Sequence, residues 1–207
     1  MVYEKYNLIY ADPPWQYSNQ STRAATKNHY PTMTFQELKS LNIKSIADNN
    51  SILIMWYTSA FARQADALAT HWGFEVKTMK LFTWVKLNKN YHQNITKQLK
   101  KHGCMNSEDV FNLINDQLRF GLGNYTRANS EDCLIAVRGK GIQRINKSVS
   151  QIILAPIGAH SAKPQEARDR IVQLYGNVPR VELFARQNVN GWDAWGNECI
   201  NDIELGE

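Results

Sequence analysis

Short continuous runs of apolar, β-prone residues recur along the 207-residue chain and constrain its fold more than any other feature. They lie at residues 6–11, 51–57, 78–85, 132–138, 151–155 and 180–185. Several are apolar throughout instead of alternating with polar residues, which is typical of strands covered on both faces. We therefore predict a sheet with a covering layer on each side.

Helical patterns separate these runs. TFQE at residues 34–37 is a capping box, residues 60–72 place their apolar side chains on one face, and a third helix should begin at Pro164 and finish near Gly176. Strands that alternate with helices predict an α/β fold with a mostly parallel sheet and helices on both faces. In such sheets ligands bind beyond the carboxyl ends of the strands.

Length and composition predict one domain spanning residues 1–207. The hydrophobic content of 43% and the charged content of 21% are those of a globular protein. Lys and Arg number 24 against 19 Asp and Glu, and the resulting net charge of +5 favours a polyanionic partner. A solvated basic surface is the alternative, which the charge balance leaves open.

Several classes of protein are disfavoured by what the sequence lacks. Cys104, Cys133 and Cys199 lie far apart, so neither a disulfide framework nor a zinc site is indicated. The five histidines have no metal-ligand spacing, and GxSxG, Walker and HExxH motifs are missing, so we expect no metal. The N-terminus does not resemble a signal peptide and the apolar runs are shorter than the ~20 residues of a membrane span, so we expect a cytoplasmic protein.

Two polar segments interrupt the alternation of strands and helices. Residues 16–33 carry Arg23 and Lys27 with no acid, and read as a loop after the first strand. Residues 86–119 form a basic insertion with six Lys or Arg against three acids, and Lys100 and Lys101 lie within it. Both segments are candidate contacts for a phosphate backbone, with a solvated loop as the equally weighted alternative.

The stretch Asp12-Pro13-Pro14-Trp15 places unusual chemistry at the end of the first predicted strand. Asp12 supplies a carboxylate acceptor, and Pro13 supplies a backbone carbonyl on a segment whose φ is fixed. The two acceptors are therefore held rigidly side by side. Trp15 adds a flat apolar wall on which a nucleic-acid base can stack.

Two fixed acceptors suit an exocyclic aromatic amine such as N6 of adenine. They hold both hydrogens and favour a pyramidal nitrogen, whose lone pair is then free to attack an electrophile. A base inside a duplex cannot reach such a pocket, so the target has to be flipped or single-stranded. A rigid turn that merely ends a strand is the alternative for these four residues alone.

ADPPW and four later blocks resemble the MT-A70 family of S-adenosylmethionine-dependent adenine N6-methyltransferases. The blocks are YPTMTFQEL (30–38), GNYTRANSEDCLIAVRG (123–139), HSAKP (160–164) and VELFARQNVNGWDAWGNE (181–198). They follow the family's order and cover most of the chain outside residues 86–119. The resemblance implies a Rossmann-like methyltransferase fold with permuted motif order, in which the catalytic strand comes first and the cofactor elements come last.

The cofactor residues are expected near the C-terminus. Lys163 lies at or beside the N-terminal cap of the third predicted helix, where an ammonium group and the helix end together make a carboxylate site. The resemblance assigns that site to the methionine tail of S-adenosylmethionine, with a solvated lysine as the alternative. The carboxylate of Asp12 can additionally hold the α-amino group of the cofactor. The other cofactor residues are expected to be Glu182, Phe184, Arg186, Asn188, Asn197 and Glu198. A structural ion pair for Arg186 and a turn amide for Asn188 stay open.

The substrate residues follow from the same resemblance. Glu131 matches an acidic position that the family places near the substrate base, and Tyr30 either covers the base or anchors its loop to the core. DNA is the expected substrate, as in prokaryotic and phage members of the family, and the cell is expected to be a bacterium or a phage-infected host. RNA is the alternative, as is a catalytically silent nucleic-acid-binding subunit. A monomer and a homodimer fit equally.

Overall fold

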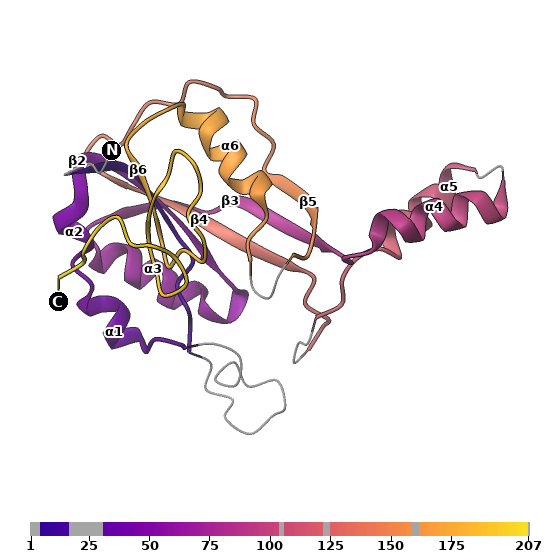
Figure 1. Cartoon of the computed structure of the whole chain (residues 1–207), viewed down its shortest axis with the longest axis horizontal. Coiled ribbons are helices and arrows are strands. Elements are labelled where there is room, and N and C mark those ends of the chain that lie inside the picture. Colours follow the sequence, from indigo (N-terminus) through magenta and orange to yellow (C-terminus); the bar gives the residue numbers. More distant parts are fainter. Residues whose placement is uncertain (1–4, 17–30, 104–105, 122–124, 159–161, 207) are drawn as a thin grey trace.

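The computed structural model describes residues 5–16, 31–103, 106–121, 125–158 and 162–206 (Figure 1). Its strands form one sheet in the order β5-β3-β4-β2-β1-β6-β7. The strands are β1 (Tyr6–Ala11), β2 (Ala47–Tyr57), β3 (Glu75–Leu87), β4 (Ser130–Arg138), β5 (Ile152–Pro156), β6 (Arg180–Leu183) and β7 (Asp193–Trp195). The helices are α1 (Phe35–Ser40), α2 (Ile43–Ile46), η2 (Ser59–Phe61), α3 (Ala62–His71), α4 (Tyr91–His102), α5 (Ser107–Asn115) and α6 (Gln165–Tyr175).

Among these strands, β4 alone runs against its neighbours. It is antiparallel to β2 and to β3, whereas the pairs β1–β2, β1–β6, β6–β7 and β3–β5 are parallel. The start of β4 therefore lies where β2 and β3 end, and Glu131 pairs with Trp84 while Asp132 pairs with Tyr57. The carboxyl ends of β1, β2 and β3 and the start of β4 therefore lie at the same end of the sheet. The predicted α/β fold with a mostly parallel sheet is confirmed.

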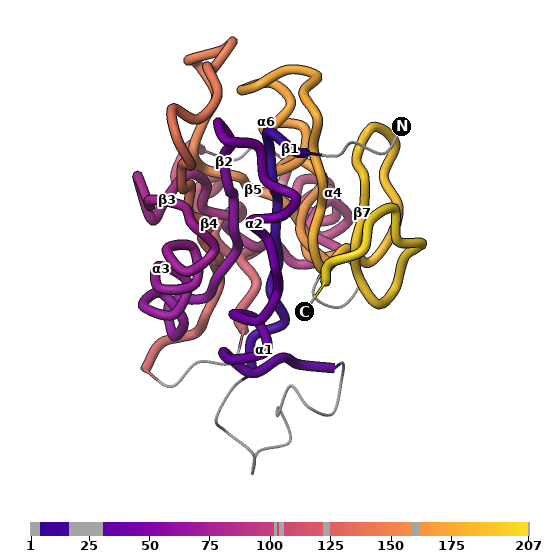
Figure 2. The backbone as a smooth tube through the Cα atoms, turned by 90° about the vertical axis from the view of Figure 1, so that its left-hand side faces the viewer, coloured from indigo at the N-terminus to yellow at the C-terminus, as the bar shows by residue number. Residues whose placement is uncertain are grey.

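Two apolar layers cover the sheet. On one face Ile9 and Leu53 belong to the core that includes Leu68 of α3, and on the other Leu8 and Ile54 belong to the core that includes Ile171 of α6. Figure 1 shows α3 and α6 on opposite sides of the sheet, and Figure 2 shows β1 and β2 side by side in the middle of the molecule. Burial on both faces explains why these strands are apolar throughout.

The basic segment 86–119 contains two helices that the sequence patterns did not predict. Helices α4 and α5 form a hairpin that projects from the end of β3, at the right of Figure 1. The base of the hairpin is closed by a bridge between Leu87 and Leu118 and by a hydrogen bond from Asn88 N to Gln117 O of 2.8 Å. Within the described residues, no helix has the length and apolarity that a membrane crossing requires.

Candidate active site

The ADPPW stretch begins where β1 ends, beside the end of β6. Asp12 N donates to Leu183 O at 3.4 Å, and Trp15 N donates to Pro13 O at 2.9 Å. The Pro13 carbonyl therefore already accepts one hydrogen bond from within the stretch, and the described residues supply no second donor for its other lone pair. The turn places Asp12 and Pro13 directly after the last residue of β1, at the carboxyl end of that strand.

Trp15 is built into the protein core. Its side chain is 7% exposed, its ring stacks on Phe61 with centroids 5.3 Å apart, and its Nε1 donates to Trp56 O at 3.2 Å. These contacts anchor the turn to β2 and η2. The stacking of Trp15 on a substrate base stays a prediction.

Asp12 is the first member of a row of four alternating charges. Lys163 Nζ lies 2.7 Å from Asp12 Oδ2 and 3.3 Å from Glu131 Oε2, and Lys86 Nζ lies 2.5 Å from Glu131 Oε1. Lys163 is the most enclosed of the four, with 8% of its side chain exposed. Residues from β1, β3, β4 and the segment before α6 thus meet in one charge network.

The local electrostatics differ for the two carboxyl groups. Burial raises the pKa of Asp12, and the opposing attraction of Lys163 does not fully offset it. Burial also opposes ionisation of Glu131, but Lys163 and Lys86 together lower the pKa of its carboxyl below the ordinary value. Although burial disfavours its charge, Lys163 lies between Asp12 and Glu131, which raise the pKa of its ammonium. The ammonium is therefore a permanent cation between two acids at neutral pH.

Lys86 was missed as a site residue by sequence reasoning, which counted it with the basic insertion. It lies at the carboxyl end of β3, two residues after Trp84, so both side chains point to the same side of the strand. Its ammonium lies 5.0 Å from the centre of the Trp84 ring. The signal in the sequence that could have found it is its position at the end of an apolar strand, where the ligand site of an α/β fold lies.

The predicted cofactor residues after β6 form a second group. Phe184 has φ +60°, a conformation that costs energy for a bulky side chain, and its ring lies edge-on to Trp195 at 5.5 Å. Arg186 Nη1 lies 3.6 Å from Glu198 Oε1, and Arg186 is close enough to Asp12 to lower the pKa of that carboxyl slightly. A Cβ at Gly196 would lie 2.1 Å from Ala185 O, so glycine lets Asn197 and Glu198 approach the end of β6.

Two of the predicted cofactor residues have their polar atoms engaged by the protein. Both carboxylate oxygens of Glu182 accept hydrogen bonds from Arg168 of α6, at 2.5 and 2.7 Å, in a buried pair. Asn188 donates to Ile200 O at 2.8 Å and accepts from Ile200 N at 3.0 Å, which holds the C-terminal loop in place. Their contact with a cofactor stays a prediction.

The predicted nucleic-acid contacts fall into three groups, of which Glu131 lies in the charge network described above. Arg23, Lys27 and Tyr30 lie outside the described residues. Lys100 and Lys101 are exposed on α4, in the projecting hairpin. Within the described residues, no group of three or more His, Cys, Asp or Glu is arranged to hold a metal ion.

Comparison with known proteins gives a consistent set of relatives. A model of the family described as MT-A70 matches residues 6–110 and 111–198. The chain is 31% identical to the Type II methyltransferase M.MunI of Mycoplasma sp over 98% of its own length and 82% of that protein. It is 27% identical to the human N(6)-adenosine-methyltransferase catalytic subunit METTL3 and 24% identical to human N(6)-adenine-specific methyltransferase METTL4. These two alignments cover 97% and 94% of this chain but only 29% and 38% of the human proteins.

Proposed function

The chain belongs to the MT-A70 family of adenine N6-methyltransferases, and we propose that it transfers the methyl group of S-adenosylmethionine to N6 of adenine in DNA. The observation that carries the proposal is the position of Asp12 and Pro13 O. Both follow the carboxyl end of β1, and Asp12 contacts a buried cation, Lys163, that also contacts a second carboxylate, Glu131. The carboxyl ends of the strands form the edge where α/β folds bind their ligands.

The residues around Asp12 suit the tail of the cofactor. That tail carries an α-ammonium and an α-carboxylate, and Asp12 and Lys163 present the complementary charges 2.7 Å apart. When bound, S-adenosylmethionine supplies an electrophilic methyl group on a sulfonium. Lys163 directly precedes Pro164, the N-cap of α6, so the helix end adds to the field that favours a carboxylate.

The same edge can hold the amine that is methylated. Lys163 Nζ donates a hydrogen bond to Asp12 Oδ2, and among the hydrogen bonds of the described residues none involves Asp12 Oδ1. Oδ1 and Pro13 O can accept the two N–H groups of the adenine amine and favour the pyramidal nitrogen that attacks a methyl group. Glu131, held ionised by two lysines, lies beside this pair and can accept a hydrogen bond from the base.

DNA is favoured over RNA as the substrate because this chain aligns along most of its length, and most of the relative's, with a methyltransferase of Mycoplasma sp, and the prokaryotic members that the sequence resembles methylate DNA. The alignment with M.MunI extends over most of both chains, whereas METTL3 and METTL4 are matched over less than two-fifths of their length. RNA is the second candidate because METTL3 is named an adenosine methyltransferase over the same residues of this chain. Within this proposal residues 1–207 form a single catalytic domain, with the α4–α5 hairpin as its insertion.

Mass spectrometry of nucleosides tests the proposal. The protein is incubated with S-adenosylmethionine and either DNA or RNA, and N6-methylated adenine nucleosides are measured. Asp12→Asn keeps the shape of the side chain but removes its charge, and should lower the rate about 100- to 1,000-fold. Asp66→Asn, on the exposed surface of α3, is the matched control and should leave the rate unchanged.

Each remaining outcome has a defined meaning. Methylation of RNA alone would replace DNA by RNA as the substrate. Binding of nucleic acid with no transfer by the wild-type protein would favour a catalytically silent subunit. A wild-type rate in Asp12→Asn would contradict the role given to the carboxylate.

A further inference from the structure

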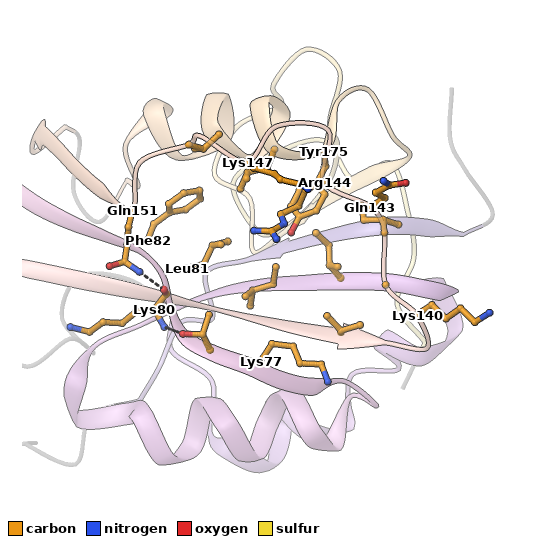
Figure 3. A pocket seen from close by; sticks show the side chains of 18 residues that line it. Lys77, Lys80, Leu81, Phe82, Lys140, Gln143, Arg144, Lys147, Gln151 and Tyr175 are labelled. Carbon is orange, nitrogen blue, oxygen red and sulfur yellow. Dashed lines mark hydrogen bonds between the residues drawn. The ribbon is translucent and has the colours of Figure 1, made fainter.

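The described residues form a pocket of about 600 Å³ whose lining does not include the charge network of Asp12, Lys163, Glu131 and Lys86. It is formed by the first half of β3, the end of β4, the segment 140–151 and the end of α6 (Figure 3). Along β3 the lining of the pocket ends at Phe82, whereas the charge network of Asp12 reaches β3 at Lys86, four residues further on. Its volume is in the range of sites that bind small organic ligands.

The pocket is lined by basic side chains and by no acid. Lys77 and Lys80 have acidic neighbours, Glu75 at 2.6 Å and Asp132 at 3.9 Å. The other three basic side chains come from one segment: Lys140, Arg144 and Lys147. None of these three takes part in an ion pair within the described residues, and Figure 3 shows Arg144 pointing toward the middle of the pocket.

The charge of this segment is one-sided. Residues 138–151 contain four Lys or Arg and no Asp or Glu. Such an arrangement is destabilised by mutual repulsion unless an anion is present, and it raises the local concentration of anions. The positive side of the pocket is therefore suited to phosphate groups.

The floor of the pocket is apolar. Leu81, Val137 and Ile142 are partly buried against the core on the α6 face, and Tyr175 stands beside Arg144 (Figure 3). An inorganic anion would leave this apolar surface unused. A flat nucleobase would cover it while its phosphates reach the basic rim, so the pocket has the two-part chemistry of a nucleotide.

We propose that this pocket binds an unpaired nucleotide of the nucleic-acid substrate, at a distance from the adenine that is methylated. The proposal rests on the proposed function, because that function supplies the strand. The apolar floor takes the base, and Lys140, Arg144 and Lys147 take its flanking phosphates. An unpaired strand is required because a paired base cannot lie on the floor of a pocket.

The size of the protein sets the length of strand that is required. Between four and eight residue steps separate the pocket residues of β3, Phe82 to Thr78, from Lys86 in the charge network, which corresponds to about 13–26 Å. At 3.4 Å per stacked nucleotide this span corresponds to about four to eight nucleotides. Strands with shorter flanks should fill the active site but fail to reach the pocket.

The experiment measures binding of fluorescent single-stranded DNA as a function of salt and length. Oligonucleotides carry one adenine with flanks of 2 or 15 nucleotides on each side, and the variant is Lys140→Gln/Arg144→Gln/Lys147→Gln. In the wild-type protein the long strand should bind with a salt slope larger by about 2 than that of the short strand. The triple variant should lose this difference and keep the wild-type rate of methylation on the short strand.

A matched variant controls for net charge. Lys39→Gln/Lys44→Gln/Arg63→Gln removes three cations from α1, α2 and α3, which cover the opposite face of the sheet from α6, and should keep the larger slope. Abasic sites in the long flanks should weaken binding about 5- to 100-fold in the wild-type protein while leaving its salt slope unchanged. The same abasic sites should have little effect on the triple variant.

The outcomes separate this inference from the proposed function. An unchanged salt slope in the triple variant, or equal affinity for paired and unpaired long flanks, would overturn the inference while methylation of the short strand upholds the proposed function. If free deoxythymidine monophosphate displaced the long flank at micromolar concentration, this result would also overturn the inference, because the pocket would then be a binding site for a free nucleotide. Failure of the wild-type protein to methylate either strand, with cofactor still bound, would instead contradict the proposed function.

Discussion

Lys163 joins two carboxyl groups whose pKa values move in opposite directions. The pKa of Asp12 is raised by burial, although Lys163 lies next to it, whereas that of Glu131 is lowered because a second lysine, Lys86, also contacts it. The difference between the two acids therefore comes from the number of cations that each one contacts. A further hydrogen-bond donor, such as an amine, would therefore stabilise the ionised carboxylate of Asp12, whereas the carboxylate of Glu131 is already kept ionised by its two lysines.

Replacing Lys86 by methionine should raise the pKa of Glu131. The hydrogen bond at 2.5 Å is lost, and Lys163 remains as the only cation in contact with the carboxylate. We expect a loss of stability of about 1.5–3 kcal/mol at neutral pH, the range for a hydrogen bond to a charged group. NMR titration of labelled glutamate measures the pKa. Lys89→Met, which replaces an exposed lysine at the base of the hairpin, is the control, and an unmoved Glu131 pKa in Lys86→Met would contradict the electrostatic effect given to Lys86.

Glu131→Gln should destabilise the protein in a pH-dependent manner. Because the folded-state pKa of Glu131 lies below its ordinary value of 4.5, the unfolded chain binds more protons between those two values. The stability that Glu131 contributes is thus complete above about pH 5 and is lost as the pH falls through the lowered pKa. The variant should lose about 3–5 kcal/mol at pH 7, the cost of breaking a buried pair, and less at pH 4. Urea unfolding at both pH values checks this, and a constant difference would argue against it.

At the scale of elements, α6 is joined to the sheet by a buried ion pair. Arg168 and Glu182 are 7% and 6% exposed, and their two hydrogen bonds link the first half of α6 to the middle of β6. The same helix carries Lys163 at its approach, and the same strand leads to Phe184 and Arg186. This pair therefore sets the relative position of both halves of the predicted cofactor site.

Breaking the pair on one side should cost more than replacing both partners. Arg168→Met leaves the Glu182 carboxylate buried without its partner and should destabilise the protein by about 3–5 kcal/mol. Arg168→Met/Glu182→Leu removes both charges and should recover most of that loss. Chemical denaturation measures stability, and calorimetry measures cofactor binding in each variant. If the double variant is as unstable as the single one, burial of an unpaired charge is not the cause.

Elements with a strong local signal could be predicted from the sequence, and those fixed by tertiary pairing could not. The apolar runs located β1 to β6 within a few residues, and the capping box at Thr34 is present at the start of α1. The sequence contains no sign that β4 is antiparallel, since strand direction follows from connections and not from composition. Helices α4 and α5 were missed because their residues were interpreted by charge, although Asn106 and Asp109 form a second capping box.

The same distinction applies to the site. Asp12 and Lys163 were expected together from the motif and from a helix start, and their side chains do meet. The contact between Glu131 and Lys86 depends on the register between β3 and β4, which includes two irregularities that no pattern in the sequence encodes. Lys86 was therefore grouped with the surface charges of its segment, although it is directed into the site.

At the scale of the whole molecule, the α4–α5 hairpin is separable from the rest of the fold. Two backbone hydrogen bonds join its ends: Asn88 N donates to Gln117 O, and Arg119 N donates to Lys86 O at 2.7 Å. The helices expose Leu99, Val110, Phe111 and Ile114, whereas Leu113 is buried. Because its ends lie side by side, the hairpin can be removed without separating β3 from β4.

Replacing residues 90–116 by a short glycine-serine linker should leave the fold intact and weaken nucleic-acid binding. We expect a melting temperature within a few degrees of the wild-type value and unchanged cofactor affinity, since Asp12, Lys163 and Glu131 lie outside the hairpin. Removal of Lys97, Lys100 and Lys101 should reduce the salt slope for single-stranded DNA by about 2.

A charge variant separates the helices from their cations. Lys97→Gln/Lys100→Gln/Lys101→Gln keeps the hairpin, and it should reproduce the loss of salt slope if phosphate contacts are the cause. If the slope is unchanged in both proteins, the hairpin does not contact the strand. Both proteins lack the same three cations, and only the excision variant also lacks the two helices. If the salt slope falls only on excision, the helices themselves, with their exposed apolar residues, contribute to nucleic-acid binding and the three cations do not.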